Sequence, residues 1–383
     1  MRIAIVYDCL FPVNTGGGER VYRRMAELLV ERGHSVDYLT RRQWGDGHEP
    51  DASFTVVPVW SGEIYDASGG RRTAAAAGFA AAAFGELRRR RGEYDLVIAS
   101  ALPVLNVFAA RAATIGTRTR LLSDWLEVWT WRKWREYSGP LVGTVASVLQ
   151  WVALRLTSDV TVNSSFTRAR IRRYRRRLDP IVLGLLDLAE APVTAHPTPV
   201  DPGLVLFAGR HIPDKQLTAL PAAIGVARRR DPSVHVVVVG TGPETEALRR
   251  AVEAEDVGPL FDVRGRVEDD ELARLFSEAA VLVNPSRREG FGLVVAEAAA
   301  VGTPSVVVAG DDNAAADLIE AGVNGFVADD AGAESLGSAI LDAVGGGSAL
   351  RATTAEWFAT ARRSQNLGSS VDEIVKRYSS SAR

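Results

Sequence analysis

Two glutamates near residue 290 have a spacing that suits binding to two parts of one extended ligand. Glu289 and Glu297 are eight positions apart, and the segment from Gly290 to Leu293 lies between them. Backbone amides of a glycine-bearing turn at the start of a helix can bind a phosphate. The stretch therefore indicates a binding site in which a phosphate lies on the amides and each carboxylate contacts a different part of the ligand.

The elements around this stretch place it at the edge of a sheet. Ala280 to Asn284 is a short apolar run typical of a buried strand, and Leu293 to Val301 is predicted to be a helix that stops at Gly302 to Pro304. The loop between them runs from Pro285 to Gly292. Because ligands of open α/β sheets bind outside the carboxyl ends of strands, we expect this loop to face a ligand. Alternatively, the acid only complements the helix dipole.

The stretch from Arg288 to Glu297 resembles the E-x7-E motif of the retaining glycosyltransferases of family 4, which have the two-domain GT-B architecture. The resemblance implies that Glu289 holds hydroxyls of the donor sugar and that Glu297 binds the nucleotide ribose. It also implies donor contacts from four residues between them: Gly290, Phe291, Gly292 and Leu293.

A second motif of the same family follows the predicted strand Leu204 to Ala208. The Gly-Arg-x4-Lys pattern resembles the family's phosphate clamp, in which Arg210 and Lys215 would neutralise the donor diphosphate. Lysine occurs at only three positions of this arginine-rich chain. Since an ammonium and a planar guanidinium are not interchangeable, Lys215 indicates a geometric demand. Gln216 stands where the family usually has glycine.

Two more loops in this half follow predicted strands. Gly240-Thr241-Gly242-Pro243 comes after Val234 to Val239, and Gly265 to Val267 comes after Phe261 to Val263. They resemble the family segments that approach the diphosphate and the nucleobase through backbone atoms. Together with the preceding loop, the resemblance implies five further donor contacts: Gly209, Gly240, Gly242, Arg266 and Val267.

The N-terminus begins with a strand, a glycine loop and a helix. Met1 to Tyr7 is the predicted strand, Phe11 to Gly18 the loop, and Glu19 to Arg32 the helix. The loop lacks the dinucleotide fingerprint G-x-G-x-x-G. The Gly-Gly-Gly-Glu-Arg run resembles the N-terminal signature of the same family, which implies donor contacts from Gly17 and Gly18. A flexible glycine turn is the alternative.

Four of the eight tryptophans lie between Asp124 and Trp134. Because this segment follows the predicted strand Arg120 to Ser123, it is expected to form an aromatic wall suited to a sugar ring or another flat acceptor. The family often has a histidine where Leu126 stands here. The acceptor contacts are predicted at four positions of the segment: Asp124, Trp125, Glu127 and Trp129. The alternative is that these tryptophans pack a loop.

Length and pattern predict two α/β domains. At 383 residues the chain suits two domains, and strands alternate with helices in both halves, as in doubly wound parallel sheets. The expected fold is GT-B, with two Rossmann-like domains facing across a cleft in which the motif residues converge. The predicted limits are 1–187 for the acceptor domain, 188–203 for a proline-rich linker, 204–355 for the nucleotide-sugar domain, and 356–383 for a C-terminal helix that crosses back.

The composition of the chain limits which partners and bound groups are expected. The net charge of −2 gives no overall field that favours nucleic acid, so no nucleic-acid partner is expected. Cys9 is the single cysteine, which excludes an internal disulfide framework and a multi-cysteine zinc site. With no Asp-x-Asp motif, no metal is expected, and a UDP- or GDP-type sugar serves as co-substrate rather than as a bound cofactor. The N-terminal strand predicts a cytoplasmic enzyme.

Two stretches are compatible with peripheral contact at the inner face of the membrane. Tyr137 to Leu154 carries no charge over 18 residues, and seven of the ten residues from Arg168 to Arg177 are arginine. Gly139, Pro140 and Gln150 make the first stretch a poor transmembrane helix, and we expect a buried or interfacial helix. A solvated basic helix is the alternative for the arginines.

The motifs together imply a retaining, metal-independent glycosyltransferase that moves a sugar from a nucleotide-diphosphate sugar to a hydroxyl. The tryptophan segment is compatible with a natural product, an aminocyclitol, a lipid-linked sugar or a glycan as acceptor. Two alternatives remain at this point: a nucleotide-sugar isomerase on the same scaffold, and a non-catalytic sugar-nucleotide-binding subunit, which the absent histidine at Leu126 favours.

Overall fold

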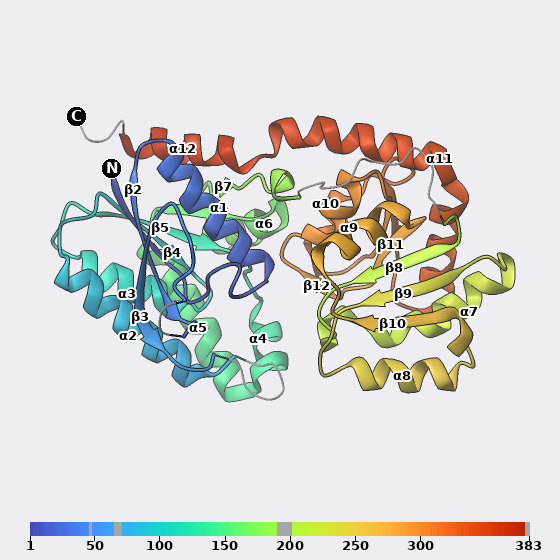
Figure 1. The fold of residues 1–383 in the computed structure, drawn as a ribbon. Helices are drawn as coiled ribbons and strands as arrows, with labels where there is room; N and C mark the ends of the chain where they lie inside the picture. Colours follow the sequence, from blue (N-terminus) through green and yellow to red (C-terminus); the bar gives the residue numbers. More distant parts are fainter. Residues whose placement is uncertain (46–47, 65–70, 190–200, 380–383) are drawn as a thin grey trace. The chain divides into compact units, whose positions relative to one another are not determined.

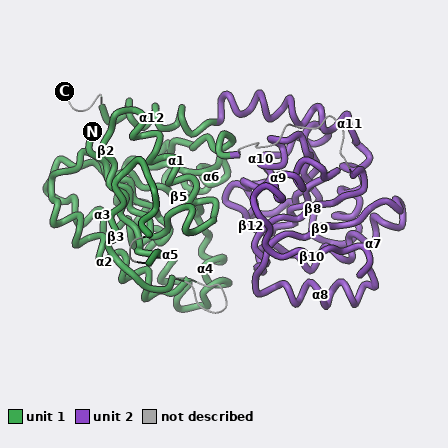
Figure 2. Tube along the Cα trace, viewed as in Figure 1, with its two compact units in different colours: residues 1–188, 366–383 green, residues 189–365 purple. Residues whose placement is uncertain are grey.

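The protein is described from a computed structural model, which covers residues 1–383 apart from 46–47, 65–70, 190–200 and 380–383. The chain forms two compact units (Figure 2). Unit 1 comprises Met1–Leu188 and Asn366–Arg383, and unit 2 comprises Ala189–Gln365.

The predicted domain limits can be placed on this division. The first unit's long segment ends at Leu188, next to the predicted limit of 187, and the second unit extends to Gln365 rather than 355. Residues 190–200, most of the predicted linker 188–203, lie outside the described residues.

Unit 1 is built on a parallel sheet in the order β3-β2-β1-β4-β5-β6-β7 (Figure 1). Its strands are β1 Arg2–Val6, β2 Ser35–Arg42, β3 Thr55–Ser61, β4 Leu96–Ser100, β5 Arg120–Trp125, β6 Asp159–Val162 and β7 Ile181–Val182. Its helices are α1 Gly17–Glu31, α2 Thr73–Arg89, α3 Leu105–Thr114, α4 Trp131–Ser138, α5 Pro140–Leu156, α6 Ser165–Tyr174, the 3-10 helix η1 Leu186–Leu188, and α12 Leu367–Ser379.

Unit 2 repeats this plan with a parallel sheet in the order β10-β9-β8-β11-β13-β15. Its strands are β8 Leu204–Ala208, β9 His235–Val239, β10 Phe261–Gly265, β11 Val281–Asn284, β13 Ser305–Val308 and β15 Gly325–Ala328, with a small separate pair of β12 Arg288–Glu289 and β14 Asp312–Asn313. Its α-helices are α7 Leu220–Arg230, α8 Thr245–Ala254, α9 Asp269–Glu278, α10 Leu293–Ala300 and α11 Ala333–Ser364. Its 3-10 helices are η2 Pro213–Lys215, η3 Leu217–Ala219, η4 Gly258–Leu260 and η5 Ala314–Leu318.

The sequence accounts for these elements locally. Central strands such as β4 and β11 are buried at every residue and are apolar up to their last residues, Ser100 and Asn284, as in parallel sheets buried on both faces. Helix α1 is amphipathic, and its buried side chains Val21, Met25 and Leu28 recur at helical spacing. Ser164 accepts a hydrogen bond from Thr167 N at 3.1 Å and caps α6.

The strand order identifies one crevice in each sheet. In unit 1 the order reverses between β1 and β4, and in unit 2 between β8 and β11, as in the classical six-strand Rossmann order. Loops that follow the two strands at such a reversal diverge to opposite faces and leave room for a ligand. The expectation of two Rossmann-like, doubly wound parallel sheets is confirmed. The loops after these four strands are therefore the candidate ligand-binding loops.

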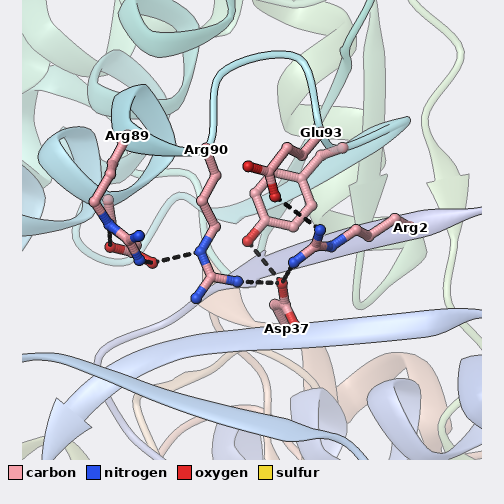
Figure 3. Close-up of polar contacts among 7 residues, drawn as sticks. Arg2, Asp37, Arg89, Arg90 and Glu93 are labelled. Carbon is pink, nitrogen blue, oxygen red and sulfur yellow. Dashed lines mark hydrogen bonds and ion pairs between the residues drawn. The ribbon is translucent and has the colours of Figure 1, made fainter.

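A cluster of charged residues lies near the amino-terminal ends of β1 and β2, away from the loops that follow the strands of unit 1 (Figure 3). The buried carboxylate of Asp37 accepts hydrogen bonds from Arg2 at 3.0 Å, Arg90 at 2.9 Å and Tyr94 at 2.8 Å. Two guanidinium groups and a hydroxyl thus compensate the desolvation of one buried acid. The cluster joins β1 and β2 to the end of α2, so it stabilises the sheet and takes no part in the crevice.

The C-terminal region contributes one helix to each unit. Helix α11 belongs to unit 2 and has non-helical dihedral angles at Gly347, while α12 belongs to unit 1. In unit 1, Arg32 donates to Asp372 at 2.5 Å, and Leu367 N donates to Asp187 at 2.8 Å. Residues 366–383 therefore form part of the N-terminal unit.

Candidate functional site

The loops after β8 and β11 of unit 2 are joined by Asp214. Its carboxylate accepts from Arg287 at 3.0 Å and lies 2.8 Å from a guanidinium nitrogen of Arg288, while its backbone carbonyl accepts from Arg287 N at 2.9 Å. These contacts fix the β8 loop beside the β11 loop at the point where the strand order reverses. The predicted site residues Lys215 and Glu289 are the immediate sequence neighbours of this junction.

Lys215 and Glu289 form an ion pair. The ammonium of Lys215 donates to Glu289 Oε1, and the same oxygen accepts from Ser286 at 3.0 Å and from Asn284 at 3.3 Å. Burial by itself would raise the pKa of Glu289, but the charge of Lys215 and the three hydrogen bonds outweigh it and lower the pKa. Glu289 is therefore held as an ionised carboxylate.

The segment around Asn313 supports the Glu289 carboxylate through contacts to the backbone of the β11 loop. Asn313 donates to the carbonyl of Ser286 at 2.9 Å and to that of Val308 at 2.8 Å. Its neighbourhood also pairs β14 with β12, in the register Glu289 to Asn313. The backbone of Ser286 and Glu289 is thus fixed on two sides, so the direction of the Glu289 side chain is determined before any ligand arrives.

The glycine loops of unit 2 are packed backbone against backbone. Gly209 N donates to Val239 O at 3.0 Å, and Gly240 N donates to Gly265 O at 2.7 Å, which extends the sheet edge beyond the ends of β8, β9 and β10. A Cβ at Gly240 would stand 1.8 Å from Gly209 O. Glycine is required there because any side chain would overlap a neighbouring main chain.

His211 lies between the predicted donor-binding loops after β8 and β9, and the sequence analysis did not single it out. Its backbone N donates to Thr241 O at 3.0 Å, its carbonyl accepts from Glu244 N at 2.9 Å, and its Nδ1 lies 2.8 Å from Thr245 Oγ1. Burial lowers the pKa of the ring. A Cβ at Gly242 would stand 2.3 Å from His211 O, so His211 and Gly242 fix the β8 loop against the β9 loop.

The other predicted donor residues of unit 2 lie around this edge. Arg210 and Arg266 are exposed, Val267 is half-buried, and Gly290 and Phe291 are half-buried in the loop before α10. Gly292 has φ +99° at the N-cap of α10, and a Cβ there would stand 2.7 Å from Ala315 Cβ. A left-handed glycine thus turns the chain into α10, which begins at Leu293, with Glu297 half-buried in its second turn.

Gln216 adopts the left-handed conformation, with φ 49° and ψ 40°. This conformation costs roughly 1 kcal/mol for a residue with a Cβ. Gln216 therefore adopts a backbone conformation that glycine would favour at this position of the loop that carries Lys215.

The chemistry open to this edge follows from its charges. The ammonium of Lys215, the exposed guanidinium of Arg210 and the N-terminal amides of α10 are all donors suited to phosphate oxygens. Glu289 is an acceptor suited to hydroxyl groups. Within the described residues, no group of three or more His, Cys, Asp or Glu side chains could hold a metal ion.

In unit 1 the glycine loop opens α1 beside the β5 loop. Gly17 is the first residue of α1, two positions earlier than predicted. A Cβ at Gly18 would stand 2.9 Å from Leu126 Cδ1 and 3.1 Å from the hydroxyl oxygen of Tyr7. The structure thus brings Leu126, the residue at the family's histidine position, directly against the glycine turn.

Asp124 is a buried structural acid. It accepts from Tyr22 at 2.5 Å and from Thr161 at 2.6 Å, which links α1 to β5 and β6. Burial raises the pKa of Asp124 to about 6, although the bonds from Thr161 and Tyr22 act in the opposite direction. Asp124 is fully buried, so it supports the glycine helix and does not line a surface.

The predicted aromatic wall is divided between core and surface. Trp125, the last residue of β5, lies in the hydrophobic core and donates to Ser123 at 3.0 Å, and every residue of this strand after Arg120 is buried. Trp129 is half-buried, donates to Glu127 at 2.6 Å, and packs on Trp134 with ring centroids 4.5 Å apart. Glu127 and Trp129 therefore remain accessible in part, whereas Asp124 and Trp125 do not.

The residues that the sequence reasoning missed in unit 2 share one property. Each is a polar residue at the end of a strand or in the loop after it. Asn284 ends β11 and Ser286 follows it, and both donate to Glu289 in the same loop, whereas Asp214, in the loop after β8, accepts from Arg287 in the loop after β11. A polar residue ending an apolar strand was the available signal, most clearly at Asn284.

Comparison with known proteins agrees with this arrangement. A family model described as "Glycosyl transferase 4-like domain" matches residues 16–184, and one described as "Glycosyl transferases group 1" matches residues 193–355. The D-inositol 3-phosphate glycosyltransferase of Streptomyces griseus is 38% identical over 120 residues, which are 29% of this chain and 25% of that protein. The chain spans 25% to 43% of the length of the first curated relatives that it matches.

Solved structures match over nearly the whole chain. Sucrose-phosphate synthase (tll1590) from Thermosynechococcus elongatus has a TM-score of 0.79 at 19% identity, covering 99% of this chain and 98% of that one. Anabaena Alr3699/HepE, solved in complex with UDP-glucose, has a TM-score of 0.70 at 19% identity, covering 99% and 100%. With two adjoining family models and the shared two-sheet fold, this chain belongs to the family 4 glycosyltransferases of GT-B architecture.

Proposed function

We propose that the protein transfers a sugar from a nucleotide-diphosphate sugar to a hydroxyl group of an acceptor. The observation that carries this proposal is the contact between Lys215 and Glu289 where the strand order of unit 2 reverses. A cation for phosphate and an ionised carboxylate for hydroxyls are there adjacent, beside the start of a helix. A sugar diphosphate presents both groups within one short ligand.

Each residue of unit 2 has a proposed role. Arg210 and Lys215 bind the diphosphate and stabilise the charge that develops on it as the sugar leaves. Glu289 positions the sugar through its hydroxyls, and Glu297 binds the ribose. The backbone of the loops supplies the remaining donor contacts at Gly209, Gly240, Gly242, Arg266, Val267, Gly290, Phe291, Gly292 and Leu293.

We propose that the transfer retains the anomeric configuration by a front-face route, in which the departing phosphate helps to deprotonate the acceptor. Arg210, Lys215 and the α10 amides would perform the charge stabilisation that a cation performs in other transferases, so the proposed reaction is metal-independent. The family resemblance supports both statements.

The donor is proposed to be of UDP or GDP type. A structural neighbour solved with UDP-glucose supports a nucleotide sugar. In unit 1 we propose that Gly17 and Gly18 take part in donor binding and that Glu127 and Trp129 contact the acceptor. Asp124 and Trp125, which are buried, support these residues from the core.

The test is incubation of the purified protein with a panel of UDP- and GDP-sugars, followed by measurement of released nucleotide and of the donor's configuration. Release of nucleotide that increases with an added acceptor supports transfer. An epimerised donor without release would instead establish the isomerase, which the glycosyltransferase family models do not favour. Tight donor binding without turnover would establish a binding subunit.

We also propose that the protein is cytoplasmic and that unit 1 touches the inner face of the membrane. The single, buried Cys9 supports a reducing compartment. Within the described part of the chain, no helix is both long and apolar enough to cross a bilayer. The exposed side chains of α5 support surface contact.

A further inference from the structure

Helix α5 of unit 1 carries an apolar row on its exposed side. Leu141 is 82% exposed, Val145 59% and Val148 54%, and these three positions follow one another at intervals of four and three. Val142 and Trp151 flank the row and are also exposed. Residues at such intervals lie on one face of a helix, so their side chains form a continuous apolar strip.

The opposite face of α5 fixes the direction of this strip. A Cβ at Gly143 would stand 2.2 Å from Trp134 O, so α4 and α5 touch closely there. Gln150 donates to Trp129 O at 2.7 Å and accepts from Trp129 N at 2.9 Å and from Trp134 Nε1 at 3.1 Å. Because Gly143 and Gln150 face the protein, the row of Leu141, Val145 and Val148 must face outward.

The strip departs from the usual pattern of a surface helix. A helix at the surface of a globular protein normally presents charged side chains to water, yet the only charged residue of α5 is Arg155, at its C-terminal end. A contiguous exposed apolar surface of this kind marks an interaction site.

Basic side chains stand at both ends of the strip. At the N-terminal end, a shallow pocket is lined by Trp131, Arg132, Arg135, Glu136 and Pro140. The guanidinium carbon of Arg135 lies 4.4 Å from the centroid of the Trp131 ring, and Arg132 pairs with Glu136 at 2.9 Å. Glu136 is the only acid of that pocket, so the end is net positive.

The C-terminal end has the same character. The guanidinium carbon of Arg155 lies 3.6 Å from the centroid of the Trp151 ring, and its NH2 donates to Tyr174 O at 3.4 Å. That contact places it beside the end of α6, where Arg172 and Arg173 are exposed; Arg172 pairs with Asp179 at 2.6 Å, so Arg155 and Arg173 carry the positive charge of this end. Arginine over tryptophan at each end combines a cation with an amphipathic ring.

We infer that this surface docks on a bilayer with anionic head groups, α5 lying along the membrane plane. Leu141, Val145 and Val148 enter the boundary between head groups and acyl chains, while the arginines at both ends contact lipid phosphates. The tryptophans lie at the depth that such rings favour.

The charges favour this occupant over a second copy of the chain. In a twofold-symmetric contact the same patch meets itself, so either arrangement of two α5 helices would bring basic ends close to basic ends. An anionic surface compensates both ends at once. The inference gives the residues and the lipid class of the membrane contact proposed above, and it does not depend on glycosyl transfer.

The test is sedimentation of the full-length protein with vesicles of phosphatidylcholine alone and of phosphatidylcholine mixed equally with phosphatidylglycerol. We expect binding to the mixed vesicles that weakens as salt rises, and little binding to the neutral ones. The combined variant Arg132→Gln with Arg135→Gln should bind about 25-fold more weakly, since each arginine near an anionic surface contributes about fivefold. The control Arg88→Gln, which changes an exposed arginine near the end of α2, should bind like the wild type.

The apolar contribution is tested separately. Leu141→Ser, Val145→Ser and Val148→Ser together should abolish sedimentation with the mixed vesicles, whereas Ile115→Ser, at another exposed apolar position of unit 1, should have no effect. Circular dichroism verifies the fold of each variant, and if the triple variant is unfolded the arginine variant decides alone. Light scattering measures mass in solution. Equal binding of wild type and arginine variant, or a wild-type dimer that the serine variant makes monomeric, would overturn the inference.

Discussion

The ammonium of Lys215 donates to the carboxylate of Glu289 across two loops that are 74 positions apart in the chain. Both side chains are largely buried, and Ser286 and Asn284 complete the hydrogen bonds of the acid. The two opposite charges compensate each other, and we propose that a bound donor supplies phosphate oxygens to the lysine and hydroxyls to the glutamate. Glu289 is thus held as an ionised carboxylate in the loop where we propose that the donor binds.

The pairing predicts a pH dependence of stability for Glu289→Gln. The folded pKa of Glu289 is lowered from its ordinary 4.5, so the stabilisation is complete above that value and is lost as the pH falls through the folded pKa. The wild type should therefore exceed the variant in unfolding free energy at neutral pH, and the two should converge in acid. Urea titrations across this pH range measure it. A difference that stays constant into strong acid would contradict the assignment.

Glu297→Ala should weaken nucleotide binding more than it weakens sugar positioning. Glu297 is half-buried in the second turn of α10, away from the hydrogen bonds around Glu289. Loss of hydrogen bonds from hydroxyls to a charged acceptor corresponds to roughly 1.5–3 kcal/mol, or about 10- to 150-fold in affinity. Isothermal titration with the free nucleoside diphosphate measures it, with Glu289→Gln as the comparison variant. Unchanged nucleotide affinity in Glu297→Ala would remove the ribose assignment.

Gly242→Ala should disturb both the fold and donor binding. Its Cβ would stand 2.3 Å from His211 O, which is main chain and cannot rotate away, so a cost of roughly 1–3 kcal/mol is expected from overpacking. The matched control is Gly225→Ala in α7, where the nearest atom would be 3.8 Å away. That control should gain about 0.5–1 kcal/mol from helix propensity. Equal unfolding free energies for the two variants would show that the β8 and β9 loops are not packed as described.

The pattern of strands and helices predicted the fold because local signals agreed with the tertiary structure. The apolar run Ala280 to Asn284 forms the strand β11, and the predicted loop from Pro285 to Gly292 lies between β11 and α10, with the short strand β12 inside it. Lys215 could be singled out because lysine is rare in this chain. The contact with Glu289 could not be derived from residue types, since it depends on the neighbouring positions of β8 and β11 in the sheet.

The acceptor segment shows where sequence reasoning reaches its limit. Four tryptophans between residues 124 and 134 predicted one aromatic wall, but Trp125, at the end of the buried strand β5, packs in the core, whereas Trp131, at the start of α4, is exposed to solvent. Composition alone does not distinguish the two directions. The uncharged helix after Tyr137 likewise packs against the protein on one side only. Its packed side is defined by the contacts of Gly143 and Gln150, which the sequence does not reveal.

Asp124→Asn should remove a pH dependence of the opposite sign to that of Glu289. The pKa of Asp124 rises from 3.8 to about 6 in the folded state, so between these values the folded protein binds more protons than the unfolded one. Wild-type stability should then fall as the pH rises through this window, by up to about 3 kcal/mol from this one group. The variant should lack that loss. Chemical unfolding at pH 4 and pH 7 measures it, and parallel curves for both proteins would refute the buried ionisation.

The central claim is that Lys215 stabilises the departing diphosphate of a nucleotide sugar, and turnover of UDP- and GDP-sugars by Lys215→Met tests it most directly. The substitution keeps the apolar stem and removes only the ammonium, and Lys376→Met, at an exposed position of α12, is the matched control. We predict that Lys215→Met, like Arg210→Ala, loses roughly 100- to 1000-fold in kcat while remaining folded, and that Lys376→Met keeps the wild-type rate. Turnover by folded Lys215→Met close to the wild-type rate would contradict the claim.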